Sequence, residues 1–505
     1  MWLGIPNDQG TNVVPSGTLN PDAPPPSVPL CVDLDGTLVF TDTLLELAVS
    51  AVKDSWLCIF LLPRWLIMGK AYLKRRVAEV GSLDVSTLPY NLAFLQWLKS
   101  QAESGRSIYL VTAADESIAR EIAAHVGCFD DVMASDGVFN AAGHNKLLLL
   151  QNRFGNNFDY AGNAAVDLSI WRSCRLAIVV HASRRVLLAA RAAGNVGLVF
   201  ARPARNPAVL ARTLRIHQWA KNVLVFVPLL AARQLANLHL LANSAVVFLA
   251  FSLCASSVYI FNDLIDLTSD RRHPTKRRRP LASGDISIPE ASVVFVACVA
   301  ASATLLVWAS WPTVAVLAVY FLTTVLYSLY LKRLPLIDVL TLSGLYVLRI
   351  IGGHSATSIP YSTWLMSLAI FFLSLALCKR VSELWNSRNM QRLHIPGRDY
   401  RVTDLELITM LGVSAGYAAV VLFAIYTESA YVIRLYPQPG LLLILLPVLL
   451  SWLSRIWLLA YRGGMDEDPI IFAVRDRFSY GVLAIGWLIF WLASHDWIKI
   501  PMFRG

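Results

Sequence analysis

The sequence predicts a membrane protein built from an N-terminal soluble α/β domain and a C-terminal all-α polytopic bundle. Hydrophobic residues make up 56% of the 505 residues, but they are unevenly distributed. Up to about residue 210 the composition is that of an ordinary soluble protein, whereas from Lys221 onward long apolar segments alternate with short charged loops. Since a membrane-spanning helix needs roughly 20 predominantly apolar residues, the second half is predicted to cross the bilayer repeatedly.

About nine segments of the second half meet this requirement, of which the first is marginal. Loops after the even-numbered segments are rich in Lys and Arg, whereas those after the odd-numbered segments carry few bases. The positive-inside rule therefore places the basic loops and the N-terminal domain in the cytoplasm. The candidate spans centre on residues 221–240, 243–262, 288–309, 312–330, 336–354, 361–379, 405–427, 440–460 and 479–495.

The net charge of +10 is concentrated in the predicted cytoplasmic loops. Bases beside spans usually mark topology, lipid headgroups or phosphate ligands, so we predict contact with membrane lipid and no nucleic-acid partner. The seven cysteines show no CxxC or Cys/His cluster, and we interpret them as reduced packing residues. The sequence leaves the oligomeric state open.

The N-terminal half begins with a segment, residues 1–28, that is rich in Pro, Asn, Gly and Ser, which predicts a disordered leader. PLCVDLDGT then forms a short apolar strand that ends at Asp33 and Asp35. Alternation along a strand places these two carboxylates on one face, where such a pair can share Mg²⁺ and act as nucleophile and acid/base. Taken alone, the motif is also compatible with a turn that has an aspartate cap.

Three later segments add polar residues at further predicted strand edges. GRSIYLVTAAD ends a strand at Thr112, whose hydroxyl can hold a phosphoryl oxygen, and NAAGHNK supplies Lys146 as a cation. FDYAGNAAVDLSIW provides a strand, a glycine turn, and then Asn163 and Asp167. Acids, hydroxyl and lysine at the strand edges indicate a phosphoryl-transfer site in an α/β sheet.

These motifs resemble the haloacid dehalogenase-like phosphatase superfamily over roughly residues 29–200. The resemblance implies a Rossmannoid sheet with a mainly helical cap at about residues 41–105. It also implies that Asp33 is the nucleophile and that Asp35 protonates the leaving oxygen and then activates water. Thr112 and Lys146 would bind the phosphoryl group, and Asp33, Asp35 and Asp167 would hold Mg²⁺.

One position departs from that superfamily. Its fourth motif usually begins Gly-Asp, whereas this chain has Gly162-Asn163. An asparagine keeps an oxygen ligand for Mg²⁺ but brings no charge. The domain is then either a working phosphatase or a degenerate binding module, and we favour the phosphatase because both acids of the first motif are present.

The stretch YIFNDLIDLTSDRRHPTKRRRPLASG places acids where the second predicted span ends. On a helix, Asn262, Asp266 and Asp270 line one stripe and Asp263 lies beside them. Their carboxylates repel one another unless a cation lies between them. Mg²⁺ suits such a site because it takes a few carboxylates and leaves positions for phosphate oxygens.

Bases follow these acids directly, among them Lys276 and Arg277. Arg and Lys beside a metal site suit a multiply anionic ligand, since Arg can grip a phosphate through two hydrogen bonds. We therefore predict Mg²⁺–diphosphate binding at the membrane surface. The alternative interpretation is a solvated helix end whose acids pair with neighbouring bases.

NDxxDxxxD at the end of the second span resembles the UbiA superfamily of intramembrane prenyltransferases. YSLYLKR, with Tyr327 and Lys332, resembles that superfamily's second motif. UbiA enzymes that act on aromatic substrates usually carry another aspartate-rich motif after the sixth span. Here that position reads CKRVSEL, with Lys379 and Arg380 instead.

LRIHQWAKNVLVFVPLLAA, NDxxDxxxDRRHPTKRRRP, LRIIGG, CKRVSEL and EDPIIFAVRDR together resemble the decaprenyl-phosphate phosphoribosyltransferase family over roughly residues 208–495. The resemblance implies transfer of 5-phosphoribose from 5-phosphoribosyl-1-diphosphate (PRPP) to a polyprenyl phosphate, for lipid-linked pentose donors of a bacterial cell envelope. It implies an inner (plasma) membrane enzyme in which Asp263 and Asp266 are catalytic. Asp263, Asp266 and Asp270 would hold Mg²⁺, and the substrate-binding residues would be Asn262, Lys276, Arg277, Tyr327, Lys332, Lys379 and Arg380.

Together the two resemblances predict the domain organisation: a leader (1–28), a phosphatase domain (29–200), a linker or surface helix (201–217) and a UbiA-like transferase bundle (218–500). We expect the fused phosphatase to remove the 5-phosphate of the transferase product. A UbiA-type prenyltransferase that attaches an isoprenoid diphosphate to an aromatic or quinone precursor is disfavoured by the missing second aspartate motif. A membrane transporter with a regulatory domain is disfavoured because the acids cluster at one interface.

Overall fold

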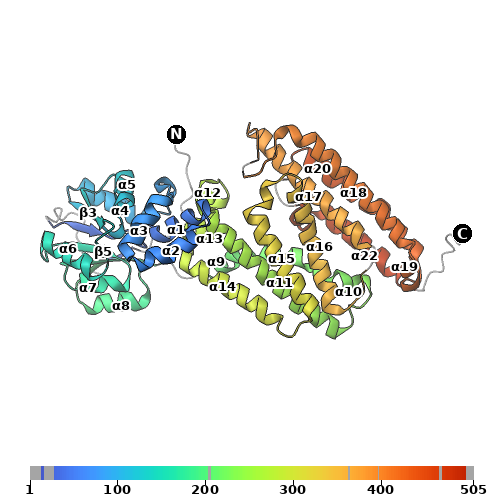
Figure 1. Ribbon diagram of the computed structural model, residues 1–505, viewed down its shortest axis with the longest axis horizontal. Helices are drawn as coiled ribbons and strands as arrows, with labels where there is room; N and C mark the ends of the chain where they lie inside the picture. The colour runs from blue at the N-terminus through green and yellow to red at the C-terminus, as the bar shows by residue number, and fades with distance from the viewer. Residues whose placement is uncertain are drawn as a thin grey trace. The chain divides into compact units, whose positions relative to one another are not determined.

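The computed structural model describes residues 13–15, 28–202, 206–361, 364–395, 397–465 and 469–495. The chain forms two compact units. The first comprises Met1–Thr213 and Ile260–Val294, and the second comprises Leu214–Tyr259 and Phe295–Gly505. The first unit therefore contains the acidic and basic stretch as well as the N-terminal domain (Figure 1).

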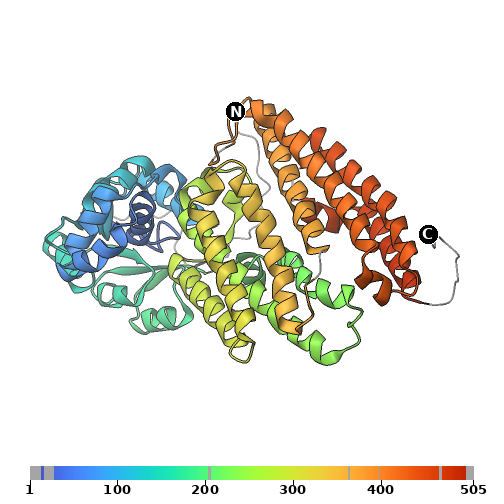
Figure 2. The same cartoon turned by 45° about the vertical axis from the view of Figure 1, so that its right-hand side comes forward.

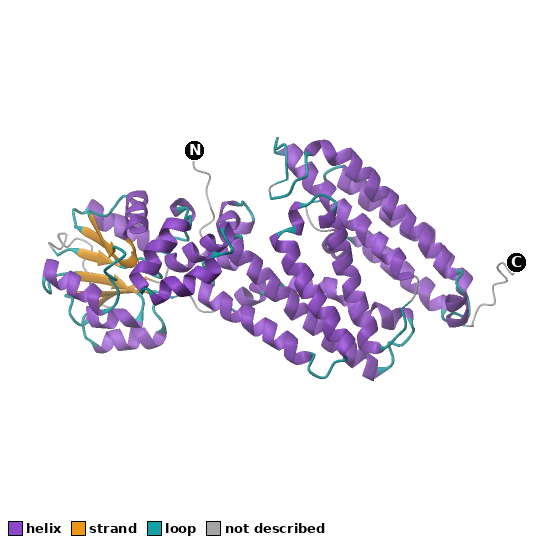
Figure 3. Cartoon of the chain, viewed as in Figure 1, coloured by secondary structure: helices purple, strands orange, loops and turns teal. Residues whose placement is uncertain are grey.

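A seven-stranded sheet lies at the centre of the first unit, in the order β1-β7-β6-β5-β2-β3-β4 (Figure 3). Six strands run parallel, and β1 pairs antiparallel at the edge. The predicted α/β domain is confirmed. The strands are β1 (Val13–Pro15), β2 (Leu30–Val32), β3 (Ile108–Asp115), β4 (Asp131–Ser135), β5 (Asp159–Gly162), β6 (Leu176–Val180) and β7 (Val196–Phe200).

Strand β1 differs from the predicted disordered leader, residues 1–28. Val13 pairs with Phe200 and Pro15 pairs with Leu198. Because β7 ends the parallel sheet, its outer backbone groups need a partner, and an extended segment from the leader supplies one. The remaining residues up to position 27 lie outside the described part of the chain.

Both faces of the sheet are buried. Leu110 packs in one apolar cluster and the next residue, Val111, packs in another, because successive strand residues point to opposite faces. The covering helices are α4 (Leu92–Glu103), α5 (Glu116–Val126), α6 (His144–Phe154), α7 (Leu168–Trp171) and α8 (Arg184–Ala192).

A helical insertion follows β2 and corresponds to the predicted cap. It contains α1 (Thr43–Asp54), α2 (Cys58–Ile67), α3 (Lys70–Val80) and the 3₁₀ turn η1 (Val85–Thr87). Helix α4 falls within the predicted cap but belongs to the sheet layer, since its Phe94 packs against Phe200 of β7 with the ring centroids 5.2 Å apart. The insertion is therefore shorter than 41–105.

Seven helical segments in the described part of the chain are long and apolar enough to cross a membrane. In Figures 1 and 2, α17 (Trp364–Asn389) and α18 (Leu405–Thr427) run side by side. A further apolar helix, α22 (Arg477–Ala493), has 17 residues. The seven are α11 (Leu238–Ile265), α14 (Ile288–Leu305), α15 (Trp311–Leu329), α16 (Ile337–Thr357), α17 (Trp364–Asn389), Val402–Thr427 and Pro439–Tyr461.

The first predicted span, 221–240, is not a continuous helix. It forms the 3₁₀ segment η3 (Ile216–Phe226) and the short helix α10 (Val227–Ala231). This segment lies directly against α16, because a Cβ atom on Gly353 would stand 2.1 Å from the carbonyl oxygen of Val225. The glycine of LRIIGG thus permits a close backbone approach, which a side chain would prevent.

Candidate functional site

The first candidate site lies just beyond the end of β2, where Asp33 follows the strand. The Asp33 N–H donates to the carbonyl oxygen of Ala161 in β5 at 2.9 Å. Lys146 of α6 donates from Nζ to Asp33 Oδ1 at 2.6 Å and to the Tyr160 hydroxyl at 3.1 Å. The fold therefore brings together the acid and the cation that the sequence predicts, 113 residues apart in the chain.

Asp167 belongs to the same cluster. It accepts the backbone N–H groups of Asn163 and Ala164 at 3.0 and 2.9 Å, and the Tyr160 hydroxyl donates to it at 3.1 Å. Burial, and then the charge of Asp33, raise the pKa of Asp167 to about 6. Burial acts to lower the pKa of Lys146. The negative charges of Asp33 and Asp167 have the larger combined effect, so the pKa is raised.

Asp35 and Thr112 are the other residues that the sequence predicts for this site. Asp35 turns toward the cap and accepts the Thr43 N–H at 3.0 Å and the Thr43 hydroxyl at 3.3 Å. Burial, followed by the charge of Asp42, raises the pKa of Asp35 to about 7. The Thr112 hydroxyl is buried and accepts the N–H of Ala114 at 3.1 Å.

Two of the predicted Mg²⁺ ligands, Asp33 and Asp167, fit a divalent cation. After burial, the charge of Asp33 is the next cause that raises the pKa of Asp167, so a cation between the two carboxylates would relieve their repulsion. Mg²⁺ is commonly held by one or two carboxylates together with water and substrate phosphate. Asp35 is held by Thr43, and within the described residues no three His, Cys, Asp or Glu side chains gather as a ready metal site.

The second candidate site is the acidic and basic stretch of the first unit. After α11 the chain forms α12 (Leu267–Arg272), the 3₁₀ turn η4 (Lys276–Arg278) and α13 (Pro280–Ser283). Arg279 Nη1 donates to Asp263 Oδ1 at 3.1 Å and also to Asp270 Oδ2. Two of the three predicted acids, Asp263 and Asp270, therefore lie on either side of one positively charged group. A metal ion held by both carboxylates would need the same convergence.

The remaining predicted residues of this stretch lie apart from that pair. Asp266 Oδ1 lies 3.7 Å from Lys53 Nζ of α1, and within the described residues the three carboxylates form no group that could hold a metal ion together. Lys276 and Arg277 are exposed on η4, and Asn262 is partly buried on α11.

A buried ion pair joins this stretch to the cap. Arg271 donates from Nη1 to Glu46 Oε2 at 2.8 Å and from Nη2 to Glu46 Oε1 at 2.6 Å. The two side chains are 5% and 4% exposed. Arg272 adds an exposed contact, with Nη2 2.7 Å from Asp84 Oδ2 beside η1. The cap therefore binds α12 at two points.

In the second unit, Asp338 at the start of α16 is the centre of an ionic network. Arg380 Nε lies 3.0 Å from Asp338 Oδ2, and Arg398 Nη1 lies 3.2 Å from the same oxygen. The Tyr400 hydroxyl donates to Asp338 Oδ1 at 2.5 Å. Arg380 also pairs with Glu383, and its side chain is completely buried.

Two further predicted residues meet this network through Arg398. Its Nη1 donates to the Tyr327 hydroxyl at 3.2 Å and to the carbonyl oxygen of Lys332 at 3.3 Å. The second motif and CKRVSEL are therefore neighbours in the fold. Arg380 has acidic partners, so its role includes neutralising Asp338 and Glu383. Lys379 is partly buried on α17.

Arg349 lies deeper in the bundle, on α16. Nε donates to Asn222 Oδ1 at 2.6 Å, Nη2 to the Tyr320 hydroxyl at 2.9 Å and Nη1 to the carbonyl oxygen of Leu345 at 2.5 Å. These acceptors are all neutral. A buried arginine in a membrane span is costly and is usually functional.

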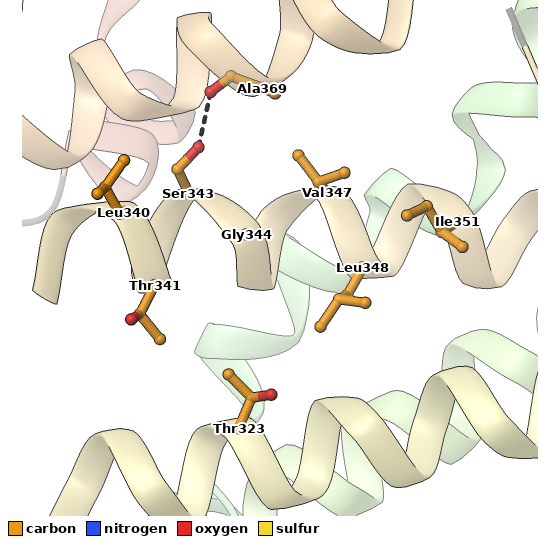
Figure 4. Close-up of a pocket in the computed structure, with 9 residues that line it drawn as sticks. All are labelled: Thr323, Leu340, Thr341, Ser343, Gly344, Val347, Leu348, Ile351 and Ala369. Atoms are coloured by element: carbon orange, nitrogen blue, oxygen red, sulfur yellow. Dashed lines mark hydrogen bonds between the residues drawn. The ribbon is translucent and has the colours of Figure 1, made fainter. Parts of the chain in front are cut away.

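An open cavity of about 490 Å³ lies on the second unit (Figure 4). Thr323 of α15, Ala369 of α17 and one side of α16 line it, and the Ser343 hydroxyl donates to the carbonyl oxygen of Ala369 at 2.6 Å. The α16 lining consists of Leu340, Thr341, Ser343, Gly344, Val347, Leu348 and Ile351. Its mainly apolar lining suits an acyl or isoprenoid chain.

The sequence analysis did not identify several residues of these sites. Asp338 and Arg349 are charged residues inside apolar segments, and that signal alone marks them as functional candidates. Lys74 of α3 donates to the Ala113 carbonyl oxygen at 2.6 Å and to Asn140 Oδ1 at 2.7 Å, and burial lowers its pKa. Nothing local in KAYLKRR distinguishes Lys74 from its basic neighbours.

Most of the similarity to known proteins lies in the second half of the chain. The sequence model of the UbiA prenyltransferase family matches residues 223–474. Decaprenyl-phosphate phosphoribosyltransferase from Mycobacterium tuberculosis (strain H37Rv) is 31% identical over 302 residues, which cover 57% of this chain and 94% of that protein. Uncharacterized protein y4nM from Sinorhizobium fredii is 37% identical over 468 residues, 91% of this chain and 89% of that one.

A solved structure, a UbiA homolog from Archaeoglobus fulgidus bound to GPP and Mg²⁺, has a TM-score of 0.43 at 16% identity and covers 56% of this chain and 99% of that chain. The seven candidate spans in the described part of the chain, together with the family match, define an integral membrane protein. The chain belongs to the UbiA prenyltransferase family, and its second half is a UbiA-type transferase. Glu467 and Asp468 of EDPIIFAVRDR lie outside the described residues.

Removing the Asp35 charge should stabilise the metal-free protein in a pH-dependent manner. The pKa of Asp35 is raised from 3.8 to about 7. Between about pH 4 and pH 7 the folded state therefore binds a proton that the unfolded state has released. Its contribution to stability is therefore lost as the pH rises from about 4 to about 7. In EDTA, Asp35→Asn should raise the Tm at pH 8 and raise it by clearly less at pH 5, where only part of the loss has occurred, as measured by thermal unfolding in detergent.

Asp136→Asn is the matched control, because Asp136 is exposed and the N–H groups of Phe139 and Val138 lower its pKa. The Tm of the Asp136→Asn variant should not rise at pH 8. An equal Tm gain for Asp35→Asn at both pH values would contradict the electrostatic explanation.

Replacing Glu46 by glutamine should destabilise the first unit strongly. The substitution leaves Arg271 buried beside a neutral group, and loss of one partner of a buried ion pair costs about 3–5 kcal/mol. Equilibrium denaturation in detergent measures the change. Glu116→Gln is the control, since Glu116 pairs with Arg120 on an exposed helix surface and its loss should cost less than about 1 kcal/mol. Similar small effects for both variants would show that the buried pair does not form.

Proposed function

We propose that the second half transfers 5-phosphoribose from PRPP to a polyprenyl phosphate, and that the fused α/β domain then removes the 5-phosphate. The observation that carries the proposal is the alignment with the mycobacterial phosphoribosyltransferase along 94% of that protein. The acidic and basic stretch from Asn262 to Arg279 supports the proposal, because the side chains of Asp263 and Asp270 both bind the Arg279 guanidinium there.

In the transfer step, a phosphate oxygen of the lipid attacks the anomeric carbon of PRPP. The bond between that carbon and the diphosphate oxygen breaks, and PPi leaves with the bonding electrons. A phosphate monoester is already anionic, so the attack needs no strong general base. Asp263 and Asp270 would hold Mg²⁺, which supplies positive charge to the diphosphate. Lys276 and Arg277 would neutralise further charge as PPi departs.

Two features of the second unit suit a lipid phosphate. The open, mainly apolar cavity beside α16 offers a surface for part of a polyprenyl chain. Arg349 is a buried cation with the neutral acceptors Asn222, Tyr320 and Leu345, so its charge favours an approaching anion. We assign Tyr327, Lys332, Lys379 and Arg380 to the support or binding of substrate in this unit.

In the hydrolytic step, Asp33 attacks the phosphorus of the 5-phosphate and the ribose oxygen leaves with a proton from Asp35. Water, activated by Asp35, then cleaves the aspartyl-phosphate and releases inorganic phosphate. Lys146 lies against Asp33 and would neutralise the transferred group, with the Thr112 hydroxyl as a further ligand. Mg²⁺ held by Asp33 and Asp167 would supply charge at the same oxygens. A pKa of about 7 lets Asp35 carry the required proton near neutral pH.

The basic loops and the charge of PRPP support a cytoplasmic active site. We propose that the protein lies in a bacterial inner membrane with its N-terminal domain in the cytoplasm. Both steps would then take place on one side of the membrane, and the product would be a polyprenyl-phosphoryl-ribose.

The test combines purified protein, Mg²⁺, PRPP and decaprenyl phosphate, with the lipids analysed by mass spectrometry. Wild type should yield ribosyl lipid without the 5-phosphate, and Asp33→Ala should accumulate the 5-phosphoribosyl lipid. Asp263→Asn should lower transfer by about 10²-fold or more, because it removes charge at the leaving diphosphate.

Asp285→Asn is the control for the transferase variant, because Asp285 is an exposed acid close by that pairs with Arg212 at 3.1 Å. Its transfer rate should equal that of wild type. If wild type stops at the 5-phosphate, the hydrolytic step is wrong. If the protein consumes an isoprenoid diphosphate with an aromatic acceptor and ignores PRPP, the phosphoribosyl proposal is wrong.

A further inference from the structure

Helix α2 of the cap exposes a continuous apolar surface. Trp56 is 65% exposed, Phe60 69% and Ile67 88%, although they are large apolar side chains. The surface, called the α2 patch below, extends from just before the helix to just after it. Its members are Trp56, Leu57, Ile59, Phe60, Leu61, Leu66, Ile67 and Met68.

The α2 patch is not needed to hold the cap together. The inner side of the helix already packs through Cys58, Leu62 and Trp65, which recur at helical spacing and join the main apolar cluster of the first unit. A helix on the surface of a soluble domain normally carries polar residues on its outer side. An apolar outer side of this extent marks a binding surface.

The position of α2 in the first unit indicates what covers the patch. The preceding helix, α1, is bound to α12 by the buried Glu46–Arg271 pair. Helix α12 begins two residues after α11 ends, and α11 is a candidate membrane span. Since α1 has 12 residues and is about 18 Å long, α2 lies close to the point at which the chain leaves the membrane.

The composition of the segment also fits a lipid surface. Trp56 and Phe60 are of the kind that settles at the boundary between headgroups and acyl chains. Arg64 and Lys70 are exposed beside them and suit anionic headgroups. Asp54 is the one acidic residue between Lys53 and Lys70.

We propose that the α2 patch inserts into the boundary between headgroups and acyl chains of the bilayer that the second half spans. The cap is then an interfacial membrane anchor, and it holds the Asp33 site at the membrane surface. This contact involves no covalent step. Its value for catalysis rests on the proposed phosphatase function: a lipid-linked phosphate would reach the site without leaving the bilayer.

Site-directed fluorescence tests the contact without any enzyme assay. Ile67→Cys and Phe60→Cys are labelled with an environment-sensitive dye in the full-length protein, which is placed in vesicles of phosphatidylcholine and phosphatidylglycerol. Leu188→Cys on α8 is the control, since Leu188 is an exposed apolar residue (57%) outside the patch. Unsubstituted protein reports the background from its seven cysteines.

Nitroxide-labelled lipid should quench the dyes at 60 and 67 severalfold more than the dye at 188, and aqueous iodide should show the reverse order. Equal quenching at the three positions would overturn the proposal. Protection of positions 60 and 67 in detergent that grows with protein concentration would also overturn it, in favour of a contact between two copies of the chain.

A second measurement addresses the catalytic consequence. The double variant Phe60→Ser/Ile67→Ser should raise the KM for a lipid-linked phosphomonoester in vesicles severalfold and leave the hydrolysis of p-nitrophenyl phosphate unchanged. If wild type hydrolyses neither substrate, the phosphatase proposal fails while the fluorescence result still decides the membrane contact. If the lipid KM is unchanged although the dyes are inserted, the anchor has no role in substrate access.

Discussion

The buried ion pair between Glu46 and Arg271 determines how the first unit is assembled. It joins the insertion that follows β2 to the short helix after α11, two parts of the chain separated by 225 residues. Both charged side chains are almost completely buried, so removing either one would leave the other charge buried without a partner and would destabilise the unit. Asp270 directly precedes Arg271 on α12, and Arg279, which binds Asp263 and Asp270, follows eight residues later, so the geometry of this arrangement depends on the docking of the cap.

The sequence was most informative where function needs a recognisable pattern. The sequence predicts Asp33, Lys146 and Asp167 as one site, and the structure brings them together because Asp33 and Asp167 follow the neighbouring parallel strands β2 and β5, while α6 carries Lys146 to Asp33. The apolar segments likewise predicted the bundle, since length and hydropathy suffice to define a span. Glu46 could not be found in this way, because its importance arises from a partner that no local pattern identifies.

The failures have specific physical causes. Residues 221–240 are apolar enough for a span, but a close approach between Val225 and Gly353 packs the segment against α16 as short helices. Helical spacing groups Asp266 with Asp263 and Asp270, and helical hydrogen bonds do continue through it, since its N–H donates to the carbonyl oxygen of Asn262 at 2.9 Å. Its carboxylate nevertheless lies 3.7 Å from Lys53 of α1, a partner distant in sequence that helical spacing cannot reveal.

Strand β1 has a consequence for the handling of this protein. Val13–Pro15 cover the outer edge of β7, whose backbone groups would otherwise offer a template for strands of other molecules. The segment before Asp33 therefore acts as a protective strand against self-association. A chain shortened to begin near residue 28 would retain the parallel strands and the apolar core, but it would expose β7 and become prone to aggregate through that edge.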